Sequence, residues 1–168
     1  MHRIAPIIAA CAILLAAPCA AATDPTSSGK WYVGNWVCSG TEPGPNGAAP
    51  FSYHTVNAFA MAPGGRWMTN RWGAQNDPSG GIAYIGYVAA QKQWIYYDFH
   101  YDGGLALVTS PGLQNGKWIW TGPYFTPDGH ELHGRIVYAV RSHDRYDRIF
   151  EAPDGGGWQR LGGDSCER

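Results

Sequence analysis

Short runs of aromatic and β-branched residues, separated by clusters of Gly, Pro, Asn and Asp, repeat along the chain from Lys30 onward. Several separators, such as Pro63-Gly64-Gly65, Asp102-Gly103-Gly104 and Asp154-Gly155-Gly156, supply residues that accept the positive φ of hairpin turns. No stretch longer than a turn shows the 3.6-residue apolar period of a helix. The spacing therefore predicts an all-β fold in which consecutive strands are antiparallel neighbours.

Ten runs have the length and the β-branched or aromatic content of strands. They are Trp31–Ser39, Phe51–Ala62, Arg66–Trp72, Ile82–Ala90, Trp94–Tyr101, Leu105–Ser110, Lys117–Gly122, Leu132–Arg141, Arg145–Ala152 and Gly157–Leu161 or beyond. An open meander would expose two edges, so we expect an antiparallel up-and-down meander of about eight to ten strands closed into a barrel. The longer connections at 40–50, 73–80 and 123–131 would form the rim of a pocket if they share one end.

The N-terminal residues have the three parts of a secretory signal: Arg3, the uncharged run Ile4–Ala17 and the small residues Ala20–Ala22. The run is too short to span a bilayer, and no later segment is apolar enough to form a transmembrane span. We expect residues 1–22 to be a signal peptide, 23–29 a short flexible lead and 30–168 a single domain. The mature protein is then periplasmic or secreted. Lipid attachment at Cys19 is the alternative, but Pro18 stands where lipoprotein signals carry a small residue.

Charge and motifs exclude several classes of function. Removal of Arg3 lowers the Lys and Arg count from 12 to 11, against 13 Asp and Glu, which leaves a net charge of −2 with neutral histidines. Nucleic acids and anionic membranes require clustered Lys and Arg, so we expect neither as a partner. The chain has no G-x-S-x-G, phosphate-binding glycine loop or H-E-x-x-H. We therefore expect a non-catalytic protein.

The mature chain keeps two cysteines, Cys38 and Cys166, because Cys11 and Cys19 leave with the signal. Two cysteines in an exported protein most simply form a disulfide. One lies in the first predicted strand and the other at the end of the last, and these strands are neighbours in a closed meander. The disulfide would then join the two ends of the sheet, unless Cys166 belongs to a tail that folds back. A redox or metal-binding pair is the alternative, although neither cysteine belongs to a C-x-x-C.

Alternation along the last strands predicts which side chains face the barrel interior. In the strand from Leu132 the apolar alternate set is Leu132, Gly134, Ile136, Tyr138 and Val140. In the next strand the corresponding set is Tyr146, Arg148 and Phe150, because Arg145, Asp147 and Glu151 occupy the opposite face. Arg148 is therefore expected inside the barrel, between two aromatic side chains.

The same test on two earlier strands adds further inward candidates. In the strand from Phe51 the larger side chains form one set, which is Phe51, Tyr53, Thr55, Asn57, Phe59 and Met61. Asn57 is thus a second inward polar residue. In the strand from Trp94 both sets are aromatic, and we expect the set of Ile95, Tyr97, Phe99 and Tyr101 to face inward.

An inward arginine keeps its charge and needs a carboxylate, tyrosine hydroxyls or a bound anion. Arg148 is therefore either part of an internal ion pair or the anchor for the acidic head of an apolar ligand. We expect Arg148, Tyr146, Asn57 and Tyr97 to line a site for a small apolar or amphiphilic molecule. The alternative is an interaction module of the cell envelope, an inhibitor or assembly factor. It would use the long loops or an exposed aromatic pair, Trp94 with Tyr96 or Trp118 with Trp120.

The G-x-W formed by Gly34 and Trp36 resembles the start of lipocalins and other calycins, in which this tryptophan packs across one end of the barrel. The whole mature chain resembles an uncharacterised family of small secreted bacterial proteins. The shared motifs are G-x-W-x-C, T-S-P-G at Thr109–Gly112, W-T-G at Trp120–Gly122, and G-G-W at Gly156–Trp158 with a terminal cysteine. The resemblance implies a calycin-like barrel with Trp36 at one end and a terminal disulfide. It implies no activity.

Haem and metal sites are not expected. Haem-binding barrels of the nitrobindin type also begin with G-x-W, but they continue with glycine where this chain has Cys38. The histidines that could ligate iron are His54, His100, His130, His133 and His143. His130 and His133, the densest pair, lie three residues apart at the start of a strand and so point to opposite faces. We therefore expect no cofactor.

Overall fold

The computed structural model describes residues 25–42, 49–73 and 80–168. The elements in this part of the chain are η1 (Pro25–Tyr32), β1 (Gly34–Glu42), β2 (Phe51–Met61), β3 (Trp67–Trp72), β4 (Gly81–Val88), η3 (Ala89–Gln91), β5 (Gln93–His100), β6 (Leu105–Ser110), β7 (Leu113–Gln114), β8 (Lys117–Phe125), β9 (Glu131–Ser142), β10 (Arg145–Asp154) and β11 (Gly157–Glu167). The predicted signal at 1–22 lies outside the described residues. Residues 25–29, part of the expected flexible lead, begin the 3₁₀ helix η1.

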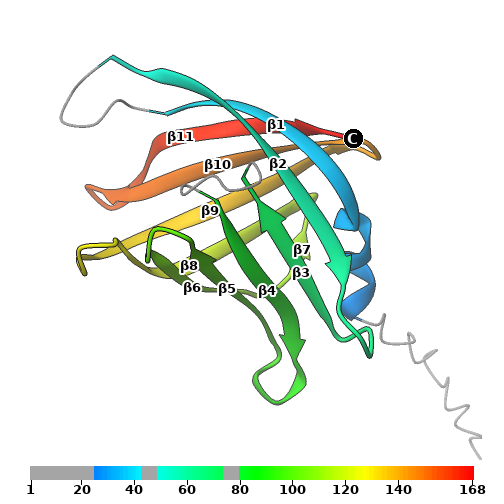
Figure 1. The fold of residues 1–168 in the computed structure, drawn as a ribbon. Coiled ribbons are helices and arrows are strands. Elements are labelled where there is room, and N and C mark those ends of the chain that lie inside the picture. The colour runs from blue at the N-terminus through cyan, green and yellow to red at the C-terminus, as the bar shows by residue number, and fades with distance from the viewer. Residues whose placement is uncertain (1–24, 43–48, 74–79) are drawn as a thin grey trace, which may run out of the picture.

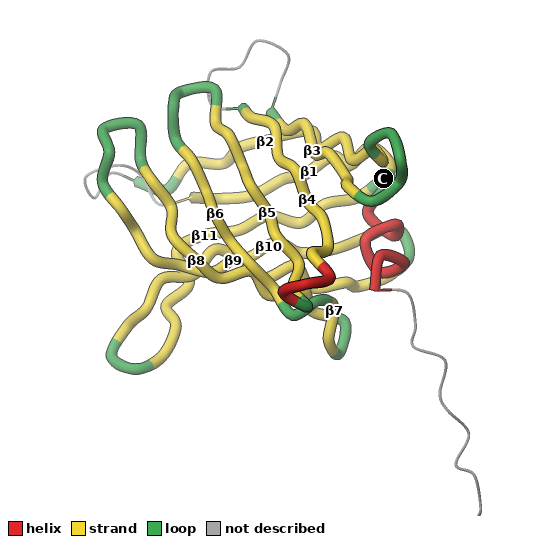
Figure 2. The backbone as a smooth tube through the Cα atoms, turned by 90° about the horizontal axis from the view of Figure 1, so that it is seen from below, coloured by secondary structure: helices red, strands yellow, loops and turns green. Residues whose placement is uncertain are grey.

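The described strands form one antiparallel meander in which each strand pairs with its neighbours in sequence, except that β6 does not pair with β7 (Figure 1). The sheet closes through two pairings, β1 with β11 and β6 with β8, so that ten strands make a barrel and the two-residue β7 pairs only with β8. Figure 2 shows strands β4–β6 crossing over strands β9–β11 on the opposite side. The predicted all-β meander and its closure are confirmed. Closure gives every barrel strand two hydrogen-bonded neighbours, which removes the exposed edges.

Strand direction gives the barrel two different ends. Helix η1 and the C-terminus lie at one end, and the β8–β9 and β10–β11 turns lie at the other (Figure 1). The three longer connections follow β1, β3 and β8, all of which run away from the η1 end. They therefore leave the barrel at the same end, as a pocket rim requires. We call this end of the barrel the open end.

Aromatic side chains fill the barrel at the η1 end. The largest fully buried side chains there are Trp36, Trp118, Trp120, Tyr32, Tyr96 and Tyr146. Trp118 and Trp120 stack with their ring centres 4.8 Å apart, and the Trp36 Nε1 donates to the Tyr32 carbonyl at 2.8 Å. This last bond holds η1 across the barrel end, so the chain here is helical where a strand from Trp31 was expected. Neither helix among the described residues has the length and apolar character needed to cross a membrane.

The seam between β1 and β11 carries the disulfide. Cys38 and Cys166 are register partners on these two strands and are bonded across a sequence separation of 128 residues. Both are fully buried. The predicted disulfide is confirmed, and it links the first strand of the barrel to the last.

Candidate functional site

The inward sets predicted for β2, β9 and β10 are confirmed. Asn57, Tyr146 and Arg148 are all buried inside the barrel. On β5 the prediction was wrong, because Trp94, Tyr96 and Asp98 are buried whereas Tyr97 is 39% exposed on the outer face. The inward packing of the Trp94 indole decides which face of β5 points into the barrel.

The Trp94 ring lies 4.7 Å from the Trp118 ring, in the aromatic core, and a Cβ at Gly29 would come within 3.0 Å of it. A tyrosine such as Tyr97 at that position would bury less apolar area than the indole. Tyr97 is therefore removed from the interior candidates. Trp94 with Tyr96, and Trp118 with Trp120, likewise form no exposed aromatic pair, since all four residues are buried.

The inward side chains of the barrel become more exposed toward the open end. Along β2 the inward residues change from fully buried Asn57, through half-buried Thr55 and Tyr53, to Phe51, which is 47% exposed. The inward faces of β9 and β10 change in the same direction, with Leu132 exposed and Phe150 half-buried. A barrel filled to both ends would bury these side chains. The inward side chains are therefore tightly packed near η1 and more exposed toward the opposite end, and we call the part of the interior that lies toward that end the open half.

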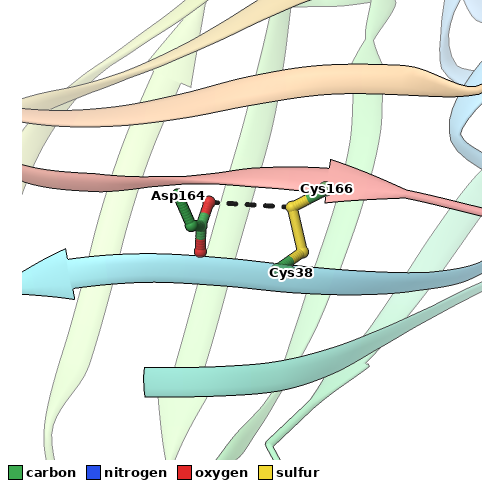
Figure 3. A group of neighbouring side chains, drawn as sticks. All are labelled: Cys38, Asp164 and Cys166. Atoms are coloured by element: carbon green, nitrogen blue, oxygen red, sulfur yellow. Dashed lines mark hydrogen bonds between the residues drawn. A yellow bond between two sulfur atoms is a disulfide. The ribbon is translucent and has the colours of Figure 1, made fainter. Parts of the chain in front are cut away.

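An ion pair between β10 and β11 lies where the packed half meets the open half. The Nε of Arg148 donates to the Asp164 Oδ1 at 3.1 Å, and a second bond joins Nη2 to Oδ2. The Tyr53 hydroxyl donates to the same carboxylate at 3.1 Å. Asp164 lies beside the disulfide, between β1 and β11 (Figure 3). Of the two alternatives for the Arg148 charge, the structure has the internal ion pair.

Sequence reasoning missed Asp164, although a signal was available. Asp164 is two residues before Cys166, so the alternation of a strand places both on the same face. An inward cysteine in the barrel seam therefore implies an inward Asp164. The predicted strand ended at Leu161 or beyond, and this uncertainty kept Asp164 out of the alternation test.

A second carboxylate, Asp98 of β5, lies in the open half and is 7% exposed. The Trp72 Nε1 donates to the Asp98 Oδ1 at 2.8 Å, and the Tyr96 hydroxyl lies 3.4 Å from Oδ2. His100, one step nearer the open end, has its Nε2 3.6 Å from Oδ2. Partial burial lowers the pKa of His100, but Asp98, with a smaller effect of Asp102, raises it by more, so the pKa is raised above 6.5.

Two tyrosine hydroxyls lie near the Asp98 carboxylate. Burial raises the pKa of Tyr96 well above 10.0, and the charge of Asp98 raises it further. Burial also raises the pKa of Tyr124, with smaller contributions from Tyr138 and Asp98. These hydroxyls therefore stay protonated, and that of Tyr96 donates to Asp98. The Tyr124 Oη is buried and has no hydrogen-bond partner among the described residues.

Glycines on neighbouring strands make room for the rings of the open half. A Cβ at Gly40 would come within 2.8 Å of the Tyr53 ring and of the Asp164 Cβ. A Cβ at Gly81 would come within 2.9 Å of the Trp72 ring. Real Cβ contacts essentially never fall below 3.0 Å, so side chains at Gly40 and Gly81 would displace Tyr53 and Trp72. The absence of side chains at Gly40 and Gly81 therefore leaves space for the Tyr53 and Trp72 rings.

Asn57 and Tyr146 lie deeper in the barrel than the open half, next to the disulfide. The Asn57 Nδ2 donates to the Cys38 Sγ at 3.1 Å, and the Tyr146 hydroxyl lies 3.9 Å from the same sulfur. Both side chains are fully buried beneath the open half. Asn57 and Tyr146 therefore form the inner boundary of the open half.

Metal-ligating side chains do not form a plausible site in the described part of the chain. Cys38, Asp164 and Cys166 place ligand atoms within 4.8 Å of one another, but both sulfurs are held in the disulfide and neither is a thiolate. His130 and His133 are exposed and lie near Asp128 and Glu131 respectively. His54 bonds to Ser39 on the outer face.

The outer surface offers two further features. A groove of about 370 Å³ crosses the seam and is lined by Ser39, Thr41, Arg160 and Ser165 together with an ion pair of Arg141 and Asp147. On the other side of the barrel, exposed aromatic side chains gather on β3, β4 and β5 and the following turn. They are Trp67, Tyr84, Tyr97, Phe99 and Tyr101, which we call the outer aromatic patch.

The fold defines the structural class: a closed antiparallel β-barrel. Among solved structures, the chain is similar to the crystal structure of Rv2717c from M. tuberculosis. The TM-score is 0.58 and the identity 16%, over 86% of this chain and 96% of that chain. A likeness at this identity shows the fold alone. No protein-family model and no curated protein matches the chain, so the resemblance to a secreted bacterial family stays a prediction beyond the barrel itself.

Proposed function

We propose that the protein is an exported, non-catalytic barrel that holds a small amphiphilic molecule in the open half of its interior. The observation that carries this proposal is the change in exposure along the inward faces, from Asn57 at 0% to Phe51 at 47%. A protein that needed its barrel only for stability would gain by filling it, because interiors pack to the density of organic crystals. Ligand sites combine apolar walls with a few placed polar groups.

The open half has this composition. Its apolar and aromatic walls come from Phe51, Tyr53, Trp72 and Phe150, which are exposed or half-buried. Its polar groups, Arg148 with its partner carboxylate, lie deeper. We infer that the polar head of the ligand lies deep in the barrel and that its apolar part extends toward the open end.

Export is part of the proposal. A disulfide forms and persists in oxidising compartments, and Cys38 and Cys166 are bonded. The signal-like sequence before Thr23 would direct the chain to such a compartment. A cytosolic copy made without residues 1–22 would meet a reducing environment while it folds.

Native mass spectrometry on the protein, produced with its own N-terminal segment and recovered from the periplasm or medium, tests this function. We expect a mass increment that disappears on denaturation. A variant Ala83→Trp, which places an indole at a fully buried inward position opposite Asp98 in the strand register, should lose the increment. Tyr97→Trp on the outer face is its control and should retain it. Absence of any increment, together with no response of the tryptophan fluorescence to amphiphiles, would show that the proposal is wrong.

The outer aromatic patch favours a second candidate function, a protein-interaction module of the cell envelope. Tyr84 and Phe99 pack edge to face with ring centres 6.5 Å apart, and Tyr84 is the register partner of Tyr97. Contiguous exposed apolar surface is typical of interaction sites. Crosslinking in intact cells with a photoreactive residue at Tyr84 should capture a specific partner if this function holds. The matched position is Val56, exposed on β2, which should capture none.

A further inference from the structure

The charges inside the barrel do not cancel. Arg148 and Asp164 neutralise each other through two contacts. Asp98 then remains, and its closest partners among the described residues are the neutral donors Trp72 and Tyr96 and the titratable His100. A buried carboxylate is costly unless a positive charge meets it.

His100 is a replaceable counter-charge. Its side chain is more exposed than that of Asp98, at 32% against 10%, and it lies on the solvent side of the carboxylate. Its ring also packs edge to face on Trp72, with ring centres 5.0 Å apart. A cation that enters from the open end therefore reaches Asp98 by displacing an imidazole that solvent can accommodate.

Aromatic side chains lie next to this carboxylate. The Trp72 indole N–H and the Tyr96 hydroxyl both contact Asp98 directly, and Tyr124 is close enough for the carboxylate to raise its pKa. A cation beside the carboxylate would also lie close to these rings, and aromatic rings attract cations, most strongly tryptophan. A carboxylate with aromatic neighbours therefore suits an alkylated ammonium group, whose charge pairs with the carboxylate and whose alkyl groups pack against the rings.

From these contacts we infer that the ligand is an organic cation, an alkylammonium compound whose positive head replaces His100 at Asp98 and whose alkyl chain lies along the aromatic walls. The inference rests on the proposed function, since it assigns the chemistry of the ligand to the same open half. It reverses the charge expected for the ligand from Arg148, because Asp164 already satisfies that arginine.

Three probes with the same chain and different heads test the inference: octyltrimethylammonium, octanoate and 1-octanol, each titrated by calorimetry below the concentration at which it forms micelles. We expect octyltrimethylammonium to bind at least tenfold more tightly than the other two. Asp98→Asn should weaken its binding at least tenfold and change octanol binding less than twofold. Asp102→Asn, which removes an exposed carboxylate at the same end, is the control and should change neither more than twofold.

The outcomes separate the inference from the proposed function. If octanoate binds as tightly as octyltrimethylammonium or more tightly, the cationic ligand is wrong and the binding function stands. If none of the three binds and native mass spectrometry finds no ligand, the binding function itself is wrong. The comparison of the three probes uses the unaltered protein, so it decides the question even if Asp98→Asn does not fold.

Discussion

The guanidinium of Arg168 lies 4.3 Å from the centre of the Trp36 ring and joins the last residue of the chain to the first strand of the barrel. Its Nη2 donates to the carbonyls of Trp31 and His143 at 2.9 and 3.0 Å, and its Nε lies 3.3 Å from the Asp144 Oδ1. One side chain thus connects η1, β1 and the β9–β10 turn. The packed end of the barrel is closed by this contact.

Replacement of Arg168 by Ala should destabilise the barrel. The side chain loses hydrogen bonds from a charged donor and a cation–π contact, and we expect the free energy of unfolding to fall by about 1–3 kcal/mol. The free energy of unfolding of Arg168→Lys should lie between those of the unaltered protein and Arg168→Ala, because an ammonium group cannot reproduce the planar, multiple hydrogen bonding of a guanidinium. Chemical denaturation measures these differences.

Arg145→Ala is the matched control, since Arg145 lies at the same end and its contacts are exposed: an ion pair with Glu167 at 3.6 Å and a hydrogen bond from its Nε to the Ser165 Oγ at 3.2 Å. Exposed pairs contribute little, so we expect a change below about 0.5 kcal/mol. Equal effects of the two substitutions would contradict a special role for Arg168.

Removal of the disulfide by Cys38→Ala with Cys166→Ala should lower the free energy of unfolding by about 2–5 kcal/mol. The bond links residues 128 positions apart and therefore restricts the unfolded chain strongly. Reduction of the unaltered protein with dithiothreitol in denaturant should give a similar loss on refolding. A loss below about 1 kcal/mol would show that hydrogen bonding between β1 and β11 closes the barrel without the covalent link.

Asp164→Asn should destabilise the folded protein more than a double variant that removes the charges of both Arg148 and Asp164. The single substitution leaves Arg148 buried without a carboxylate, which typically costs about 3–5 kcal/mol. The double variant Arg148→Met with Asp164→Leu removes both charges and should be less destabilised than Asp164→Asn alone. Denaturation of the single and double variants measures the coupling. Additive effects would argue against a direct ion pair.

Stability should depend on pH through His100. Its pKa is raised above 6.5 in the folded protein. Protonation therefore favours the folded state, and this stabilisation is fully present below pH 6.5 and is lost as the pH rises through the folded pKa. The charged groups that raise the pKa are Asp98 and Asp102. NMR titration of the ring should show a lower pKa in Asp98→Asn and a smaller decrease in Asp102→Asn.

Most of the architecture could be predicted from the residues because turn signals and strand alternation are local. The strand order, the closure and the partnership of Cys38 with Cys166 follow from short connections in a meander. Alternation also assigned Asn57, Tyr146 and Arg148 to the interior, because the opposite faces of their strands are smaller or charged. These inferences need no knowledge of which residues meet across the barrel.

The orientation of β5 could not be predicted because both of its faces are aromatic. Burial of Trp94 against Trp118 turns Tyr97 outward and carries Asp98 inward, and this contact joins strands that are not neighbours in sequence. The partner of Arg148 was likewise undetermined. An arginine needs some acceptor, and only closure of the last strand beside β10 brings Asp164 to it.

By itself, the sequence determined the class of fold, the covalent closure and the presence of charge inside the barrel. The tertiary structure decided that the Arg148 charge is neutralised, that Asp98 is the carboxylate left without a fixed positive partner, and that the inward side chains become exposed toward one end of the barrel. The reason is that alternation has a period of two residues and records only which side chains share a face. How far those side chains fill the space between opposite walls depends on contacts across the closed barrel.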